Sequence, residues 1–328
     1  MVAVCVRDDE LVFAGASGVR RVGSDEPVTL SDAFHLGSCT KAMTATTLAI
    51  LVEKGDLSWD TKITDVFPEL SSRIHRDYRS VTLLQLLSHR AGLPDDTRPD
   101  EDVFPKLRQM EGPLPKQRRE LVELVLSRPP AYKPGERMVY SNYGYVIAAA
   151  MAEAVTGQSW EELTMTLVFE PLGMKTAGFG PPSDVWGHKP SLFGCQPIAP
   201  GPNADNPPVL APAGGVHCSV EDWAKFVSEH LRGLRGSSKI LSEESFKFLH
   251  ADRYGQGYAL GWLVTEREWA GGTVLTHAGS NTLWFAVVWL APKRNVAFLA
   301  MTNCGGNRGL RSCDAAIAEM VRRFLKGE

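Results

Sequence analysis

The feature that most constrains this chain is a lysine in the first turn of a helix with a buried pattern. The segment from His35 to Asp60 reads HLGSCTKAMTATTLAILVEKGDLSWD, and apolar or small residues recur through it at three- and four-residue spacing. This spacing is typical of a helix that packs into a core. Lys41 stands at the start of that helix, three residues after Ser38. Because lysine is almost never fully buried without partners, this position needs a chemical reason.

One such reason is catalysis by the serine and the lysine together. Residues three apart share one face of a helix, so the Lys41 amine can reach the Ser38 hydroxyl. The positive end of the helix dipole stabilises negative charge that develops on the serine oxygen. Removal from water lowers the pKa of a lysine, which can then act as a base near neutral pH. The S-x-x-K pattern alone is also compatible with an ordinary surface lysine, so support must come from other segments.

Two further segments can complete such a site. In VYSNYGY, Tyr140 and Asn142 stand at the start of a predicted helix. A phenol beside a lysine can have its pKa lowered and exchange a proton, and an amide can hold both a lysine and a substrate carbonyl. In LTHAGSNTLWF, a strand that ends in His277, Gly279 and Ser280 can lay backbone N–H groups along a cleft. Taken alone, an aromatic residue at Tyr140 is more often a packing residue, and a His-x-Gly sequence is normally a turn.

Taken in this order, the three segments resemble the serine β-lactamase and penicillin-recognising enzyme superfamily. The likeness is greatest to the class C β-lactamase branch, with its DD-peptidases, D-aminopeptidases and family VIII carboxylesterases. The family order is S-x-x-K, then Y-x-N, then K-T-G or H-x-G. Other segments are similar to that family as well, and the resemblance covers nearly the whole chain: LLQLLSHRAGLP, KPGERMVYSNYGY, PLGMKTAGF and PAGGVHCSVEDWAKF.

The resemblance implies a role for each of these residues. Ser38 would be the nucleophile that forms an acyl-enzyme, and Lys41 and Tyr140 would handle its proton. Asn142 would support the lysine and the substrate, and the backbone N–H groups of Ser38 and Ser280 would form the oxyanion hole. The implied substrate is a small ester, amide or β-lactam, and neither a cofactor nor a metal is expected.

One departure from the class C pattern concerns the substrate. That branch usually has lysine at the first position of the third motif, where it meets the substrate carboxylate, whereas this chain has His277. Histidine is mostly neutral at pH 7, which favours a carboxylesterase-like or peptidase-like acyl hydrolase. The alternatives are a class C-type β-lactamase, a slowly deacylating penicillin-binding sensor and a catalytically inactive scaffold. The scaffold is disfavoured because no motif is lost, and an α/β-hydrolase is excluded because no G-x-S-x-G pentapeptide occurs.

The arrangement of apolar runs predicts the fold class. Strand-like runs at both ends, with helices between them, predict an α+β fold of the β-lactamase/transpeptidase-like type: an antiparallel sheet flanked by helices, plus an inserted all-helical domain. Residues 1–60 and 213–328 would form the α/β domain, and residues 61–212 the helical one. The Gly/Pro-rich segment 177–212 is expected to line the cleft, with Trp186 or Phe193 against the acyl group. The expected strands and terminal helix are Val2–Val6, Leu11–Ala16, Tyr258–Val264, Thr273–Thr276, Leu283–Leu290, the run VAFLAMTN and Arg311–Leu325.

Composition excludes several classes of partner. The 328 residues have a formal charge of −3, which argues against nucleic acid, and no apolar run is long enough to span a bilayer. The oligomeric state stays open.

No signal peptide is visible in MVAVCVRDDE, and six cysteines without a C-x-x-C pair favour a reduced, cytoplasmic protein. A trimmed periplasmic or secreted chain would look the same at its start. His217 beside Cys218 could suggest a metal site. No further ligand stands at zinc-like spacing from this pair, so a loop next to a strand is favoured instead.

Overall fold

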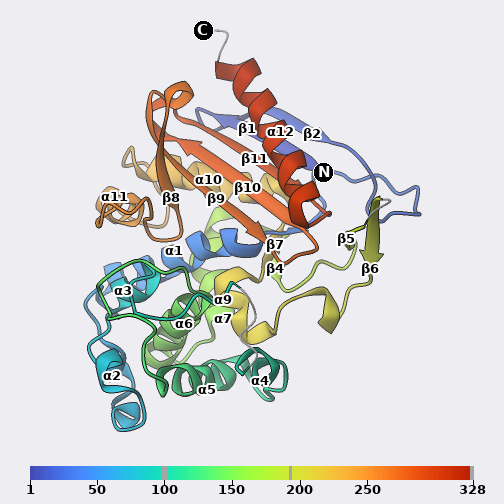
Figure 1. Cartoon of the computed structure of the whole chain (residues 1–328). Coiled ribbons are helices and arrows are strands. Elements are labelled where there is room, and N and C mark those ends of the chain that lie inside the picture. Colours follow the sequence, from blue (N-terminus) through green and yellow to red (C-terminus); the bar gives the residue numbers. More distant parts are fainter. Residues whose placement is uncertain (98–101, 192–193, 326–328) are drawn as a thin grey trace.

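A six-stranded antiparallel sheet forms the centre of the computed structural model, which describes residues 1–97, 102–191 and 194–325 (Figure 1). The strand order is β2-β1-β11-β10-β9-β8. Strand β1 lies between β2 and β11, so the two ends of the chain build one sheet. The bounds are β1 Val2–Arg7, β2 Glu10–Ala16, β8 Leu263–Arg267, β9 Gly272–Ser280, β10 Phe285–Ala291 and β11 Val296–Thr302.

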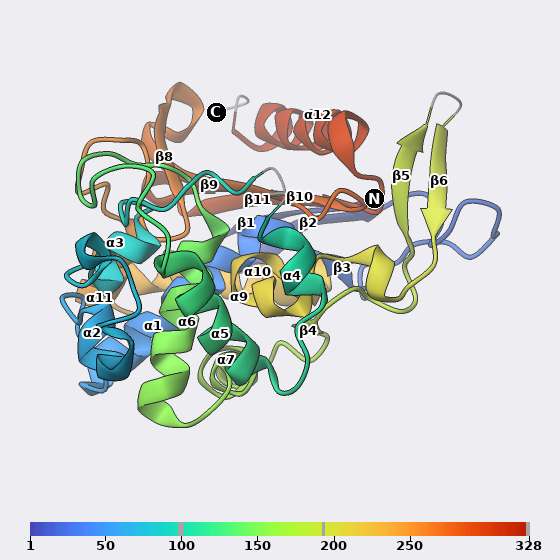
Figure 2. The same cartoon turned by 60° about the horizontal axis from the view of Figure 1, so that its bottom comes forward.

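The sheet is covered by helices on both faces (Figure 2). The runs VAVCV, FAVVWLA and VAFLAMT of β1, β10 and β11 are almost wholly buried, as continuous apolar runs predict for central strands. Helix α12 (Gly306–Leu325) packs on one face through Cys313, Ile317 and Met320. Helices α1 (Thr40–Lys54) and α10 (Val220–Gly233) pack on the other face.

The remaining helices lie on the α1 side of the sheet (Figure 2). They share one continuous hydrophobic cluster with the face of the sheet above them, so the boundaries of the two predicted domains stay a prediction. A short sheet of β3, β7 and β4 and the hairpin of β5 and β6 complete the fold. The bounds are α2 Ile63–Val66, α3 Leu83–Leu87, α4 Phe104–Arg108, α5 Leu114–Leu126, α6 Asn142–Thr156, α7 Trp160–Thr164, α8 Glu170–Leu172, α9 Ala211–Gly214, α11 Glu243–His250, β3 Phe34–His35, β4 Gly178–Phe179, β5 Gly187–Ser191, β6 Gly194–Ile198 and β7 Val216–Cys218.

One predicted strand is misplaced. The run Tyr258–Val264 becomes a strand only from Leu263 onward. Gly257 and Gly261 have φ angles of +73° and +83°, and these left-handed conformations turn the chain where the apolar residues suggested extension. The other predicted strands and the terminal helix are present with bounds shifted by a few residues.

The expectation of unpaired cysteines is wrong for one pair. Cys195 on β6 and Cys304, just before α12, form a disulfide across 109 residues of sequence. His188 on β5 forms an isolated bridge with Cys304, so the hairpin is held at the start of α12. The other cysteines are free and buried: Cys5, Cys39, Cys218 and Cys313.

Two further findings concern only the part of the chain that the structure describes. No group of three or more His, Cys, Asp or Glu side chains there could hold a metal ion. Within the same residues, no helix combines the length and the hydropathy needed to cross a membrane.

Candidate active site

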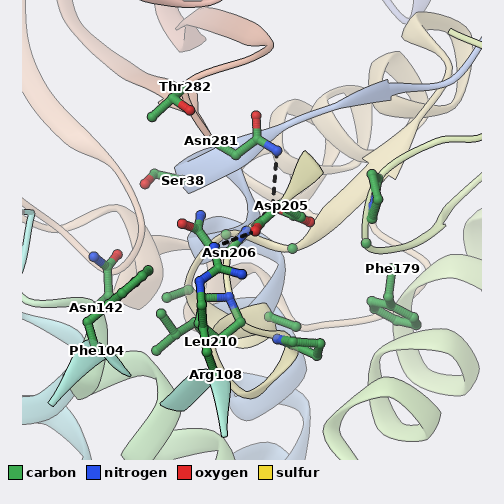
Figure 3. Close-up of a pocket in the computed structure, with 18 of the residues that line it drawn as sticks. Ser38, Phe104, Arg108, Asn142, Phe179, Asp205, Asn206, Leu210, Asn281 and Thr282 are labelled. Carbon is green, nitrogen blue, oxygen red and sulfur yellow. Dashed lines mark hydrogen bonds between the residues drawn. The ribbon is translucent and has the colours of Figure 1, made fainter. Parts of the chain in front are cut away.

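Ser38 lies in a single 3-10 turn, Gly37–Cys39, that leads directly into α1. It faces a pocket of about 900 Å³ (Figure 3). Gly37 has a φ of +52°, and a Cβ on it would be 2.2 Å from the backbone nitrogen of Ser280. Only glycine fits this turn, because the chain before Ser38 packs backbone to backbone against the end of β9. This contact brings together the backbone nitrogens that the oxyanion hole would need.

The ε-amino group of Lys41 is buried beside Ser38. Its Nζ lies 3.3 Å from Ser38 Oγ, 2.7 Å from Asn142 Oδ1 and 2.6 Å from the Ala213 carbonyl oxygen. Burial lowers the pKa of Lys41 to about 7, although the charge of Asp96 opposes the shift. The two carbonyl-type oxygens can only accept hydrogen bonds, so they take two N–H groups of the amine. The remaining position on the nitrogen, which carries the lone pair when the amine is neutral, is directed to Ser38 Oγ.

Tyr140 lies over the same amine. Its ring centroid is 4.8 Å from Lys41 Nζ, and its phenol is hydrogen-bonded with Ser38. The expectation of a lowered phenol pKa is wrong: burial raises the pKa of Tyr140, and the hydrogen bond with Ser38 offsets only part of this. The phenol is therefore neutral at physiological pH. His89 packs against the ring, with 4.4 Å between the two centroids.

Asp96 is a site residue that sequence reasoning missed. Its carboxylate accepts from the backbone N–H groups of Asn142 (2.7 Å) and Tyr143 (3.1 Å), at the start of α6. It also accepts from Asn142 Nδ2 at 3.2 Å, which leaves Asn142 Oδ1 directed at Lys41. Burial raises the pKa of Asp96. Asp96 lies 46 residues before Asn142 in the sequence, so no local pattern could have indicated this contact.

His277 is placed differently from the expectation. Its side chain is buried and is absent from the pocket lining, whereas Ser280, Asn281 and Thr282 line the pocket. The ring lies between Tyr140 and Tyr258, at centroid distances of 6.5 and 6.4 Å. Burial lowers the pKa of His277 to about 4, so it is neutral at pH 7.

The segment 177–212 does form part of the pocket wall, through Phe179 and Leu210. Trp186 does not line the pocket; its ring packs under Arg21 instead, 4.8 Å from the guanidinium carbon. Phe193 lies outside the described residues. Phe104 on α4 adds a further apolar side chain to the lining, which also includes the charged residues Asp96, Arg108, Glu161 and Asp205 (Figure 3).

A model of the Beta-lactamase family matches residues 1–322. The chain belongs to the Beta-lactamase family. Penicillin-binding protein 4 of Amycolatopsis lactamdurans is 27% identical over 311 residues, which cover 88% of this chain and 77% of the relative. A β-lactamase of Escherichia coli (strain K12) is 27% identical over 236 residues, 69% of this chain and 55% of that relative. This chain thus spans only about half of the length of the Escherichia coli relative.

Solved structures confirm the predicted fold. The octameric penicillin-binding protein homologue from Pyrococcus abyssi has a TM-score of 0.79 at 24% identity, covering 100% of this chain and 73% of that one. A penicillin-binding protein from Bacillus halodurans has a TM-score of 0.78 at 21% identity, covering 97% and 95%. This Beta-lactamase family member therefore has the β-lactamase/transpeptidase-like fold and is serine-hydrolase-like.

Proposed function

We propose that this chain is a serine hydrolase that acts on uncharged esters or amides through an acyl-enzyme on Ser38. One observation carries the proposal: the buried Lys41 amine, with its pKa lowered to about 7, lies 3.3 Å from Ser38 Oγ. A lysine in this state has a lone pair at neutral pH and can take the serine proton.

Acylation follows from this arrangement. The Ser38 oxygen attacks the substrate carbonyl carbon while its proton passes to the Lys41 nitrogen. The backbone N–H groups of Ser38 and Ser280 stabilise the negative oxygen of the tetrahedral intermediate. When the intermediate collapses, the bond to the leaving group breaks, and the leaving group takes a proton from Lys41 through the neutral phenol of Tyr140. Asn142 and the Ala213 carbonyl hold the amine in place throughout.

Deacylation uses the same groups in reverse. A water molecule attacks the acyl carbon and gives its proton to Lys41 through Tyr140. The ester bond to Ser38 Oγ then breaks, and the proton returns to that oxygen. The products are the free acid and the regenerated serine.

His277 favours uncharged substrates. A charged hydrogen bond to a substrate carboxylate contributes about 1.5–3 kcal/mol, against about 1 kcal/mol for a neutral one. The neutral imidazole of His277 is buried outside the pocket lining and offers no charge to a carboxylate, so carboxylate recognition should be at least about tenfold weaker than with a lysine that reaches the pocket. The apolar wall of Phe104, Phe179 and Leu210 instead suits an alkyl or aryl acyl group.

The test is a panel of p-nitrophenyl esters from acetate to octanoate, nitrocefin and D-amino-acid amides. We expect the wild type to hydrolyse p-nitrophenyl butyrate faster than nitrocefin, and Ser38→Ala to lose at least about 10³-fold. Ser237→Ala, an exposed serine, is the matched control and should retain full activity. A fluorophosphonate probe should label one site, and peptide mass mapping should locate it on Ser38.

The same panel separates the alternatives. Faster turnover of nitrocefin than of butyrate would favour the class C-type β-lactamase. A stoichiometric burst with penicillin and no further turnover would favour the slowly deacylating sensor. Labelling that persists in Ser38→Ala would overturn the nucleophile itself.

A further inference from the structure

The carboxylate of Asp205 joins two chain segments that flank the reacting serine. One oxygen, Oδ2, lies 2.9 Å from His35 Nε2. The other, Oδ1, accepts from Asn281 Nδ2 at 3.0 Å (Figure 3). All three side chains are nearly or fully buried: His35 is 0% exposed, Asn281 5%, and the side chain of Asp205 10%. A buried network in which each group has a partner rigidifies the segments that carry it.

His35 connects the Asp205 carboxylate to the turn that carries Ser38, the proposed nucleophile. His35 Nδ1 accepts from the backbone N–H of Gly37 at 3.1 Å. Because Nδ1 is the acceptor, the neutral ring has its proton on Nε2, and Nε2 donates to Asp205. The ring is also stacked on Trp284, with 5.8 Å between centroids. The carboxylate thus fixes the tautomer that holds Gly37, the residue before Ser38.

The second partner of the Asp205 carboxylate is Asn281, which lies directly after the end of β9. Asn281 follows Ser280, and its Oδ1 accepts from the backbone N–H groups of Leu283 and Trp284 at 3.2 Å each. Its Nδ2 donates to Asp205 Oδ1 and also to the Ala204 carbonyl, at 3.1 Å. This amide therefore ties the turn after β9 to the segment that bears Asp205.

We propose that Asp205 is a positioning residue that sets the placement of the two oxyanion-hole donors relative to each other. Through His35 it holds the backbone of Gly37, directly before Ser38, and through Asn281 it holds the turn that directly follows Ser280. The catalytic part of this inference rests on the proposed function, whereas the structural part rests on the hydrogen bonds alone. An oxyanion hole needs its donors within about 2.7–3.1 Å of the developing oxyanion, so a small shift of either segment reduces the rate.

The charge state of Asp205 supports this role. Burial raises the pKa of the carboxyl, but His35 and Asn281 oppose it, and the net effect is a pKa lowered from the ordinary value. The carboxylate is therefore ionised at neutral pH and accepts on both oxygens at once. It also lines the substrate pocket, so the brace (His35, Asp205 and Asn281) stands beside the reacting groups without touching Ser38 Oγ.

Asp205→Asn is the sharpest variant because it keeps the shape and removes one acceptor. The new amide can accept on only one side, so either the His35 tautomer changes and releases Gly37, or the Asn281 contact is lost. We expect kcat for p-nitrophenyl butyrate to fall about 10- to 100-fold with KM changed by less than about threefold. Asp184→Asn, at an exposed position in the segment between β4 and β5 where the carboxylate accepts from Ser183, is the control and should behave as wild type.

His35→Phe tests whether the brace acts as a unit. Phenylalanine keeps the stacking on Trp284 but makes neither hydrogen bond. We expect its kcat to match that of Asp205→Asn, and the double variant to be no slower than the slower single one. If the losses of kcat in the two single variants multiply in the double variant, the residues act independently and the brace is overturned. A wild-type kcat in either single variant would overturn it as well.

A second readout does not depend on activity. Hydrogen–deuterium exchange should quicken in Asp205→Asn in two peptides, one covering Gly37 and Ser38 and one covering Ser280 to Trp284, while Asp184→Asn leaves both unchanged. Unchanged exchange in both peptides would overturn the brace even if the wild type hydrolysed every ester. Quickened exchange in a chain that hydrolyses none would support the brace and refute the proposed function.

Discussion

Gly279 of β9 lies so close to Ser38 that a Cβ on Gly279 would be 2.6 Å from the Ser38 backbone nitrogen. The same Cβ would be 2.0 Å from the Leu36 carbonyl oxygen. Real Cβ atoms do not approach backbone atoms this closely, so any side chain here must move the turn or the strand. The glycine is therefore required by the close packing of the two segments on which the oxyanion hole would be built.

Gly279→Ala should accordingly lose activity by at least about 100-fold, because the strand and the turn separate. The measurement is kcat/KM for p-nitrophenyl butyrate, with the melting temperature recorded in parallel. Gly15→Ala on β2 is a matched strand glycine whose new Cβ would meet only the end of the Phe13 side chain, at 3.0 Å. It should keep its activity, and full activity in Gly279→Ala would contradict the packing argument.

Activity should rise with pH through the pKa of Lys41. The reactive form is the neutral amine, and burial lowers its pKa to about 7. Below that pKa the lysine is protonated and kcat/KM falls about tenfold per pH unit; above it kcat/KM levels off. Because the pKa of Tyr140 is raised, its titration should not end this plateau below about pH 10. A profile flat between pH 5 and 9 would contradict the assignment of Lys41 as the base.

Asp96→Asn should move this rise to lower pH. The negative charge of Asp96 raises the pKa of Lys41, so its removal lets the amine lose its proton more easily. The pH profile of kcat/KM measures the shift, and Asp56→Asn, on an exposed loop, should leave it in place. A shift to higher pH in Asp96→Asn would show that the carboxylate acts otherwise.

Acid should destabilise the folded chain below about pH 6.5. Burial lowers the pKa of six histidines, and the shift is large for four of them, which stay neutral when folded but take up a proton when unfolded: His89, His230, His250 and His277. The stability that these depressed pKa values provide is full above pH 6.5 and is lost as pH falls toward the folded pKa values. Each histidine removes about 1.4 kcal/mol of unfolding free energy per pH unit in that range.

His250→Phe isolates one of these contributions, since its pKa is lowered to about 3. Urea unfolding at pH 6.5, 5.5 and 4.5 should show a shallower pH dependence for this variant by about 1.4 kcal/mol per unit. The control His75→Phe removes a partly exposed ring and should keep the wild-type slope. Equal slopes for all three proteins would refute the prediction.

Thiol titration should distinguish the two groups of cysteines. Cys195 and Cys304 are paired and the other four are buried, so a thiol reagent should modify none in the native protein. After unfolding it should modify four without a reductant and six with one. Six reactive thiols in unfolded protein purified without a reductant would contradict the Cys195–Cys304 pair.

Local geometry could be predicted from the sequence because it depends on neighbours along the chain. Helical periodicity places Ser38 and Lys41 on one face, and the amine does lie beside the hydroxyl. The hairpin of β1 and β2 and the buried strand β11 likewise follow from apolar runs of strand length. The order of three motifs along the chain was enough to indicate the family and, with it, the fold.

The sequence by itself therefore determined the fold class and which residues could carry the chemistry, whereas tertiary structure decided how each is placed. Burial of His277, the raised pKa of Tyr140, and the hydrogen bonds of Asp96 and Asp205 depend on contacts between segments far apart in the sequence. The pairing of Cys195 with Cys304 spans 109 residues and is hidden for the same reason. Residues within one turn of a helix meet because of backbone geometry, but residues on separate loops meet only once the core has packed and excluded water.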